Sequence, residues 1–289
     1  MYGVIKVLVT GMILAGLNSC GGGSSYRETN SSINYLKRLS FYAWDGISKY
    51  ETALTRLEGY QKIEIYLNPV EDGNTDNFTA NVEKIQKKGS DVWYLMSAEP
   101  TIDYIEDQTQ IIVEYNQNHE QKIVGMAFDI EPWTKFEDQN SSENRDEWQN
   151  YLDLLSDASE VLHKNKLKIS VSIPFWLNTI TEAFPNGRNL NYEVVDIADE
   201  VIVMDYTILQ ERFYPFAENT LTYADTKASK TVKIALEMVD TNESNVSFYN
   251  DPEKIKPFLA TPIPNHSFRG YTLHTLSAFK DSGIALEAP

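Results

Sequence analysis

The chain has 289 residues, of which 42% are hydrophobic and 12% aromatic, so it can bury the core of one large domain or two small ones. Its formal net charge of −17 argues against nucleic acid or anionic lipid as a binding partner. An acidic excess also serves solubility, so this charge does not by itself indicate a function.

Residues 1–20 have the pattern of a secretory signal: one lysine, then an apolar run, then small residues that end in Cys20. The apolar run is too short for a membrane span with normal flanks. The LNSC ending resembles the lipobox of bacterial lipoproteins, which implies cleavage before Cys20 and lipidation of this cysteine. We therefore expect a signal peptide over residues 1–19, a flexible linker over residues 20–35, and a lipid anchor in the bacterial cell envelope, on its periplasmic or outer side. A plain secretory signal with a chance cysteine is the alternative.

Segments with strand and helix patterns alternate after the linker. The expected strands cover residues 39–44, 62–68, 91–97, 124–132, 167–176, 200–206, 231–238 and 269–276. The expected helices cover residues 48–60, 75–89, 101–119, 143–165, 192–198, 210–227 and 251–259.

Eight strands that alternate with helices imply parallel pairing. Eight such units over about 250 residues have the size of a TIM barrel. The predicted fold is therefore an α/β, (β/α)8 TIM barrel that forms one domain over residues 36–289. A doubly wound open sheet is the alternative, but the sequence contains no GxGxxG or P-loop motif.

The fourth expected strand, VGMAFDIEPW, ends in two carboxylates. Asp129 and Glu131 are two residues apart, so they share one face of the strand, above the small residues Gly125 and Ala127. Two carboxylates on one face raise each other's proton affinity. Placing two carboxylates together destabilises the fold, but the raised proton affinity suits an acid catalyst. The pair therefore predicts an active site.

The other strand ends supply further candidates, because active sites of TIM barrels form at the C-terminal ends of the strands. Alternation predicts that small or polar side chains face the barrel axis below a functional rim. A tryptophan there could instead be packing, and a histidine could belong to the core. The candidates are Tyr42, Trp44, Asn68, Trp133, Trp176, Asp205, Tyr206, Glu237 and His274.

Two short motifs resemble family 18 glycoside hydrolases, the superfamily of chitinases and endo-β-N-acetylglucosaminidases. FDIEPW is similar to the end of that family's strand-four signature D-x-x-D-x-D-x-E, with Asp129 and Glu131 as the final D-x-E. VIVMDY is similar to its strand-six M-x-Y, with Met204 and Tyr206 in the matching places.

The sequence departs from that family in three places. Small or apolar residues within the range 125–128 replace the earlier aspartates of the signature. Thr207 replaces the aspartate that usually follows the strand-six tyrosine, and His274 lies in the last strand, where the family usually has a tryptophan. We therefore expect a divergent branch of the superfamily.

A second resemblance is to the retaining β-glycanases whose strand four ends in Asn-Glu-Pro and whose strand seven ends in a nucleophilic glutamate. Glu131, Pro132 and Glu237 fit these positions, but Ile130 replaces the asparagine.

Both resemblances imply that Glu131 is the general acid of a glycoside hydrolase acting on an oligo- or polysaccharide. In the first, the N-acetyl group of an N-acetylhexosamine attacks, oriented by Asp129 and Tyr206; in the second, Glu237 attacks directly. The expected sugar-stacking residues are Trp44, Trp133 and Trp176.

Two other function classes remain open. The chain could be a carbohydrate-binding surface lipoprotein that has lost catalysis. A metal-dependent hydrolase would use Asp129, Glu131, Glu237 and His274, but no HxH or HExxH motif supports it. We expect no cofactor, no metal and no nucleic-acid partner.

Overall fold

The computed structural model describes residues 38–47, 50–60, 62–69, 77–97, 99–181 and 187–288. The predictions for the signal peptide, Cys20 and the linker lie outside these residues. None of the described helices is long and apolar enough to cross a membrane.

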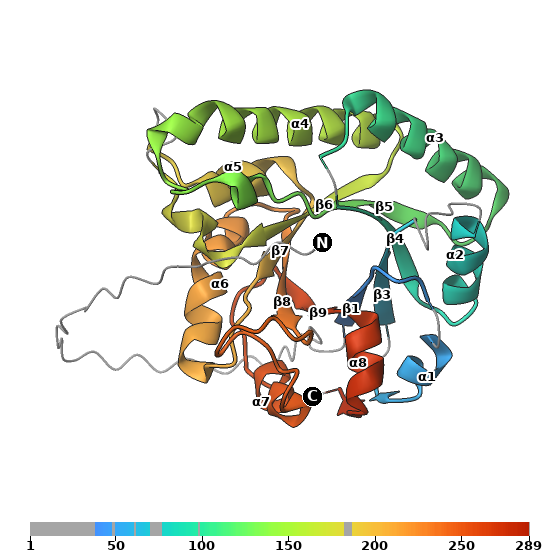
Figure 1. The fold of residues 1–289 in the computed structure, drawn as a ribbon. Coiled ribbons are helices and arrows are strands. Elements are labelled where there is room, and N and C mark those ends of the chain that lie inside the picture. The colour runs from blue at the N-terminus through green and yellow to red at the C-terminus, as the bar shows by residue number, and fades with distance from the viewer. Residues whose placement is uncertain are drawn as a thin grey trace, which may run out of the picture. The chain divides into compact units, whose positions relative to one another are not determined.

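Eight parallel strands form a closed barrel, which confirms the predicted TIM-barrel fold (Figure 1). The barrel closes where β1 pairs with β9, with Leu39 opposite Tyr271. The barrel strands are β1 (Arg38–Ala43), β3 (Lys62–Leu67), β4 (Asp91–Met96), β5 (Ile123–Phe128), β6 (Lys168–Pro174), β7 (Glu200–Met204), β8 (Thr231–Glu237) and β9 (Phe268–His274). A separate small sheet pairs β2 (Leu57–Glu58) with β10 (Leu286–Glu287).

Helices surround the barrel, and their apolar faces pack against the outward apolar side chains of the strands (Figure 1). Thr101 caps α3, because its hydroxyl accepts a hydrogen bond from the Tyr104 N–H. The helices are α1 (Tyr50–Leu54), α2 (Phe78–Gln86), α3 (Ile102–Asn118), α4 (Arg145–Lys164), α5 (Leu190–Ile197), α6 (Gln210–Asp225), α7 (Ile255–Leu259) and α8 (Leu276–Ser282). Short 3-10 helices are η2 (Pro132–Lys135), η3 (Ser142–Asn144), η4 (Phe175–Thr179) and η5 (Pro252–Lys254).

Some element boundaries differ from the sequence predictions. The helix expected over residues 48–60 is shorter, because β2 occupies part of it, and α8 was not predicted. The fifth strand was predicted to continue to Trp176 but ends at Pro174, where η4 follows. The sixth ends at Met204, two residues before its predicted end.

The barrel interior has the polar side chains that strand alternation predicts. The Ser40 and Thr272 hydroxyls are 2.8 Å apart, and the Tyr42 hydroxyl is 2.6 Å from the Ser172 hydroxyl. These contacts join β1 to β9 and to β6 across the axis.

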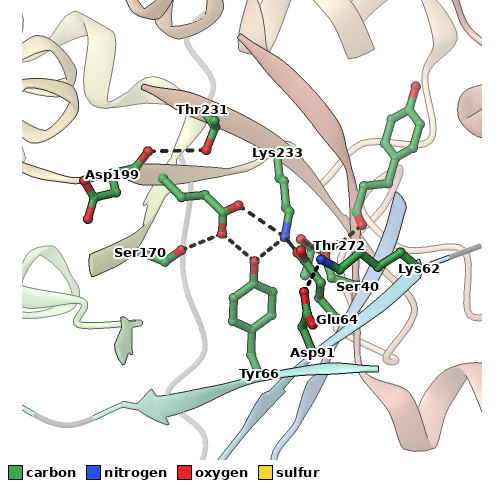
Figure 2. Close-up of polar contacts among 12 residues, drawn as sticks. Ser40, Lys62, Glu64, Tyr66, Asp91, Ser170, Asp199, Thr231, Lys233 and Thr272 are labelled. Carbon is green, nitrogen blue, oxygen red and sulfur yellow. Dashed lines mark hydrogen bonds and ion pairs between the residues drawn. The ribbon is translucent and has the colours of Figure 1, made fainter. Parts of the chain in front are cut away.

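Lys233 lies inside the barrel, only 1% exposed, in a cluster of charged groups that the sequence analysis did not identify (Figure 2). Its Nζ contacts Glu64 Oε2, lies 3.2 Å from Glu200 Oε2 and donates to the Tyr66 hydroxyl at 2.6 Å. The Tyr66 hydroxyl donates to Glu200 Oε1 at 2.6 Å, and the Ser170 hydroxyl donates to the same oxygen at 3.0 Å. Burial alone would raise the pKa of Glu64, but Lys233 holds it below its usual value.

We expect the Lys233→Met variant to lose about 3–5 kcal/mol of unfolding free energy, because Glu64 and Glu200 then remain buried without their cation. Urea unfolding measures this loss. Lys62→Met is the matched control: its ion pair with Asp91 is partly exposed, so its loss should stay below about 1 kcal/mol. Equal losses in the two variants would contradict the structural importance of the buried cluster.

Candidate active site

Asp129 and Glu131 lie beyond the C-terminal end of β5. This strand was predicted to cover residues 124–132 but ends at Phe128, so strand alternation does not place the two acids. The Asp129 N–H donates to the Met96 carbonyl at 2.8 Å and so extends the pairing of β5 with β4. Glu131 precedes Pro132, the first residue of η2. Both acids are half-buried, and Asp129 Oδ1 is buried without a hydrogen-bond partner among the described residues. The two carboxyl groups thus lie together at the rim of the barrel, with one oxygen not satisfied by the protein.

The electrostatic environment raises the proton affinity of both acids. Burial, helped by the charge of Glu237, raises the pKa of Asp129 to about 6, against an opposing effect of His274. Burial and the Asp129 charge raise the pKa of Glu131 to about 7, again opposed by His274. The pair therefore holds one proton between these values, and Glu131 is the member with the higher proton affinity.

Glu237 ends β8 and is paired side by side with His274 at the end of β9. Its Oε2 lies 2.7 Å from His274 Nδ1, and its Oε1 accepts the Val239 N–H at 2.6 Å. Burial would lower the pKa of His274, but the hydrogen bond and charge of Glu237, with the charges of Asp129 and Glu131, raise it. Glu237, which is 3% exposed, thus fixes the position of His274 and favours its protonated form.

Three rings surround His274: Tyr42 in β1, Trp44 directly after β1, and Tyr206 after the end of β7. The His274 ring stacks on Tyr206 with centroids 6.1 Å apart and meets Tyr42 and Trp44 edge-on at 5.7 and 6.3 Å. Tyr42 and Trp44 stack on each other at 5.9 Å. Burial and then the charges of nearby groups, including Glu237 and Asp129, raise the pKa of Tyr206. The structure therefore brings Tyr42, Trp44, Tyr206 and His274 together beside the acid pair.

Trp133 and Trp176 form a second aromatic group. Their rings meet edge-on at 5.8 Å, and Trp133 also stacks on Trp148 of α4 at 6.1 Å. Trp133 is 4% exposed, so much of its ring serves as packing. Trp176 is half-buried and lies in η4, so the strand alternation used to predict its direction does not apply to it. Asn68, directly after β3, is also half-buried, and its N–H donates to the Ala43 carbonyl at 3.1 Å.

Asp205 is not part of the group around Asp129. It is fully buried, and both of its carboxyl oxygens lack hydrogen-bond partners among the described residues. Burial raises the pKa of Tyr271, and the charges of Tyr60 and then Asp205 raise it further. The Tyr271 hydroxyl donates to the carbonyls of Phe258 and Thr261, so Asp205 faces that side of the barrel wall. Burial raises the pKa of Asp205 to about 9, so it is a neutral acid at pH 7.

Tyr151 is a site residue that the sequence analysis missed. It lies on α4, is 4% exposed, and its hydroxyl is buried without a partner in the described part of the chain. Burial raises its pKa, and the charges of Asp129 and Glu131 raise it further. Within the described residues, no group of three or more His, Cys, Asp or Glu side chains could hold a metal ion.

Comparisons with solved structures show the fold of the chain. A GH18 chitinase from Pseudoalteromonas aurantia matches with a TM-score of 0.54 and 12% identity, over 84% of this chain and 99% of that one. A xylanase and α-amylase inhibitor protein from Scadoxus multiflorus matches at 0.49 and 13% identity, over 86% and 99% of the two chains. A class V chitinase from Pseudomonas fluorescens Pf-5 matches at 0.48 and 12%, over 84% and 97%. The sequence matches no protein-family model and no curated protein. The chain thus has a TIM barrel like that of GH18 chitinases.

We expect Asp205→Asn to stabilise the fold at pH 7, by up to about 4 kcal/mol. The pKa of this carboxyl rises from an ordinary 3.8 to about 9, so the native state binds one proton more between these values. The contribution of Asp205 to stability is complete below its unfolded-state pKa and falls as the pH rises. An asparagine does not titrate, so the variant does not lose this stability.

Urea unfolding at pH 4 and pH 7 measures the effect, which should nearly vanish at pH 4. Asp157→Asn, at an exposed position of α4, is the control and should show little change with pH. A stabilisation that is equal at both pH values would contradict the buried neutral acid.

Proposed function

We propose that the protein hydrolyses glycosidic bonds in a glycan that contains N-acetylhexosamine, with Glu131 as the general acid. The observation that carries this proposal is the acid pair at the barrel rim, in which burial and Asp129 raise the pKa of Glu131 to about 7. A carboxyl with such a pKa is still partly protonated at neutral pH and can donate its proton. The barrel like that of a GH18 chitinase supports the same reaction class.

In the proposed reaction, Glu131 transfers its proton to the glycosidic oxygen while the bond from this oxygen to the anomeric carbon breaks. The N-acetyl oxygen of the same sugar bonds to the anomeric carbon, and Asp129 with Tyr206 orients this group. Water then attacks the anomeric carbon, and the Glu131 carboxylate accepts a proton from this water. The bond to the N-acetyl oxygen breaks, which restores the group.

The contacts of Glu237 favour this substrate-assisted reaction over direct attack by Glu237. One of its carboxylate oxygens accepts the Val239 N–H and the other bonds to His274. A carboxylate whose two oxygens are engaged in hydrogen bonds is a weaker nucleophile than a free one. We assign Glu237 the role of holding His274 in place.

Sugar binding without catalysis is the second candidate function. His274 supports it, because a charged imidazole occupies the strand end where family 18 enzymes usually have a tryptophan. Trp44 and Tyr42 would then bind sugar without bond cleavage. This candidate predicts saccharide affinity with no release of reducing ends.

We expect Glu131→Gln to lower the hydrolysis rate by about 10²–10⁴-fold and leave sugar binding intact, because the amide keeps the shape but cannot donate the proton. The assay is reducing-end release and calorimetric binding, with oligosaccharides of N-acetylglucosamine, glucose and mannose. Glu147→Gln, an exposed glutamate on α4, is the control and should keep full activity. Undiminished turnover by Glu131→Gln would rule out the general-acid role. Binding without cleavage by the unmodified protein, across the whole panel, would support the non-catalytic function.

We expect Glu237→Gln to retain substantial activity, because the attacking group comes from the substrate. Single-turnover rates of this variant and the unmodified protein measure the difference. A near-total loss, as large as that of Glu131→Gln, would favour direct attack by Glu237 and a substrate without an N-acetyl group.

A further inference from the structure

The Tyr151 hydroxyl is a buried donor without a partner in the described part of the chain, and such groups are rare in folded proteins. Leaving a buried hydroxyl unsatisfied costs about 1–3 kcal/mol, so its retention requires an explanation. The ring is held firmly: Trp148 and Trp133 meet it edge-on, at 6.2 and 6.3 Å. The position of the hydroxyl is therefore fixed by the packing of its ring.

The same site contains a buried acceptor without a partner. Asp129 Oδ1 has no hydrogen bond among the described residues, and the charge of Asp129 reaches the Tyr151 hydroxyl more strongly than that of Glu131. Trp133, which touches Tyr151, follows Glu131 by two residues in η2. An unsatisfied donor and an unsatisfied acceptor at one site complement each other.

We propose that the Tyr151 hydroxyl is a positioning group for the acid pair: it donates a hydrogen bond to Asp129 through one water, and thereby keeps the proton of the pair on Glu131. A donor to the ionised form of a carboxyl favours that form. With Asp129 ionised, the remaining proton resides on Glu131, where the proposed hydrolysis requires it. This inference concerns the proposed function, but its first test does not depend on activity.

The other ionisable groups that face the pair act differently. His274 of β9 is a cation that lowers the pKa of both acids, and Glu237 of β8 raises that of Asp129. Tyr42 of β1 already bonds to the Ser172 hydroxyl, and Tyr206 stacks on His274. Tyr151 is thus the buried tyrosine near the pair whose hydroxyl is unpartnered in the described part of the chain.

The test is a pH titration of the carboxyl groups of the full chain. NMR of 13C-labelled Asp and Glu monitors this titration in the unmodified protein and in Tyr151→Phe. Glu131→Gln and Asp129→Asn assign the signals. The unmodified pair should titrate in two steps near pH 6 and pH 7. In Tyr151→Phe we expect the lower step to rise by about one pH unit, a tenfold gain in proton affinity.

Tyr94→Phe is the matched control, because it removes a buried hydroxyl that bonds to Gln108 and should leave both steps unchanged. If the protein is active, the pKa that governs the acid side of its kcat/KM profile against pH should rise by the same amount in Tyr151→Phe. Unchanged titration steps would overturn the proposal, and a raised KM with unchanged steps would show that the hydroxyl binds substrate instead. If the protein hydrolyses nothing, the proposed function fails while the NMR titration still decides the role of Tyr151.

Discussion

The desolvation of carboxyl groups inside a closed barrel is the constraint on which the rest of this structure depends. Deep in the barrel, Glu64 and Glu200 both form ion pairs with Lys233, which keeps the pKa of Glu64 low. At the rim, burial also removes Asp129 and Glu131 from water, but no lysine among the described residues pairs with them, and their pKa values rise. Burial thus gives an ion cluster in the barrel interior, where Lys233 pairs with the carboxyl groups. At the rim, where Asp129 and Glu131 have no such partner, the same burial gives carboxyl groups with raised pKa values.

His274 determines how far the acids at the rim depart from ordinary behaviour. As a cation it opposes the effect of burial on Asp129 and Glu131, and Glu237 stabilises its charge through Nδ1. Glu237 acts in two directions, because its own charge raises the pKa of Asp129. A tryptophan at this strand end would supply a flat apolar surface without charge. His274 offers less area for stacking, but its charge lowers the pKa of both Asp129 and Glu131.

Strand alternation predicted the barrel and the rim residues that lie within its strands, Tyr42, Glu237 and His274, because a residue in a strand has only two directions. The same rule was sufficient to find Lys233, which shares a face of β8 with Ala235 and Glu237. It does not apply to Trp176, because β6 ends at Pro174 and η4 has a different periodicity. It could not find Tyr151, because a helical pattern shows which face is apolar but not which strand end a long side chain reaches.

The composition of β5 explains why groups on other elements matter for Asp129. Below Asp129 the strand carries Gly125 and Ala127, neither of which has a polar side chain to donate. A Cβ at Gly125 would lie 1.9 Å from the Lys168 carbonyl oxygen, so the close approach of β5 to β6 excludes any larger residue there. Hydrogen bonds from side chains to the acid pair must therefore come from neighbouring elements. The Tyr151 hydroxyl on α4 and Asp129 Oδ1 are both buried without hydrogen-bond partners in the described part of the chain. The proposed hydrogen bond between them, through one water, would make the packing of α4 part of the acid chemistry at the rim.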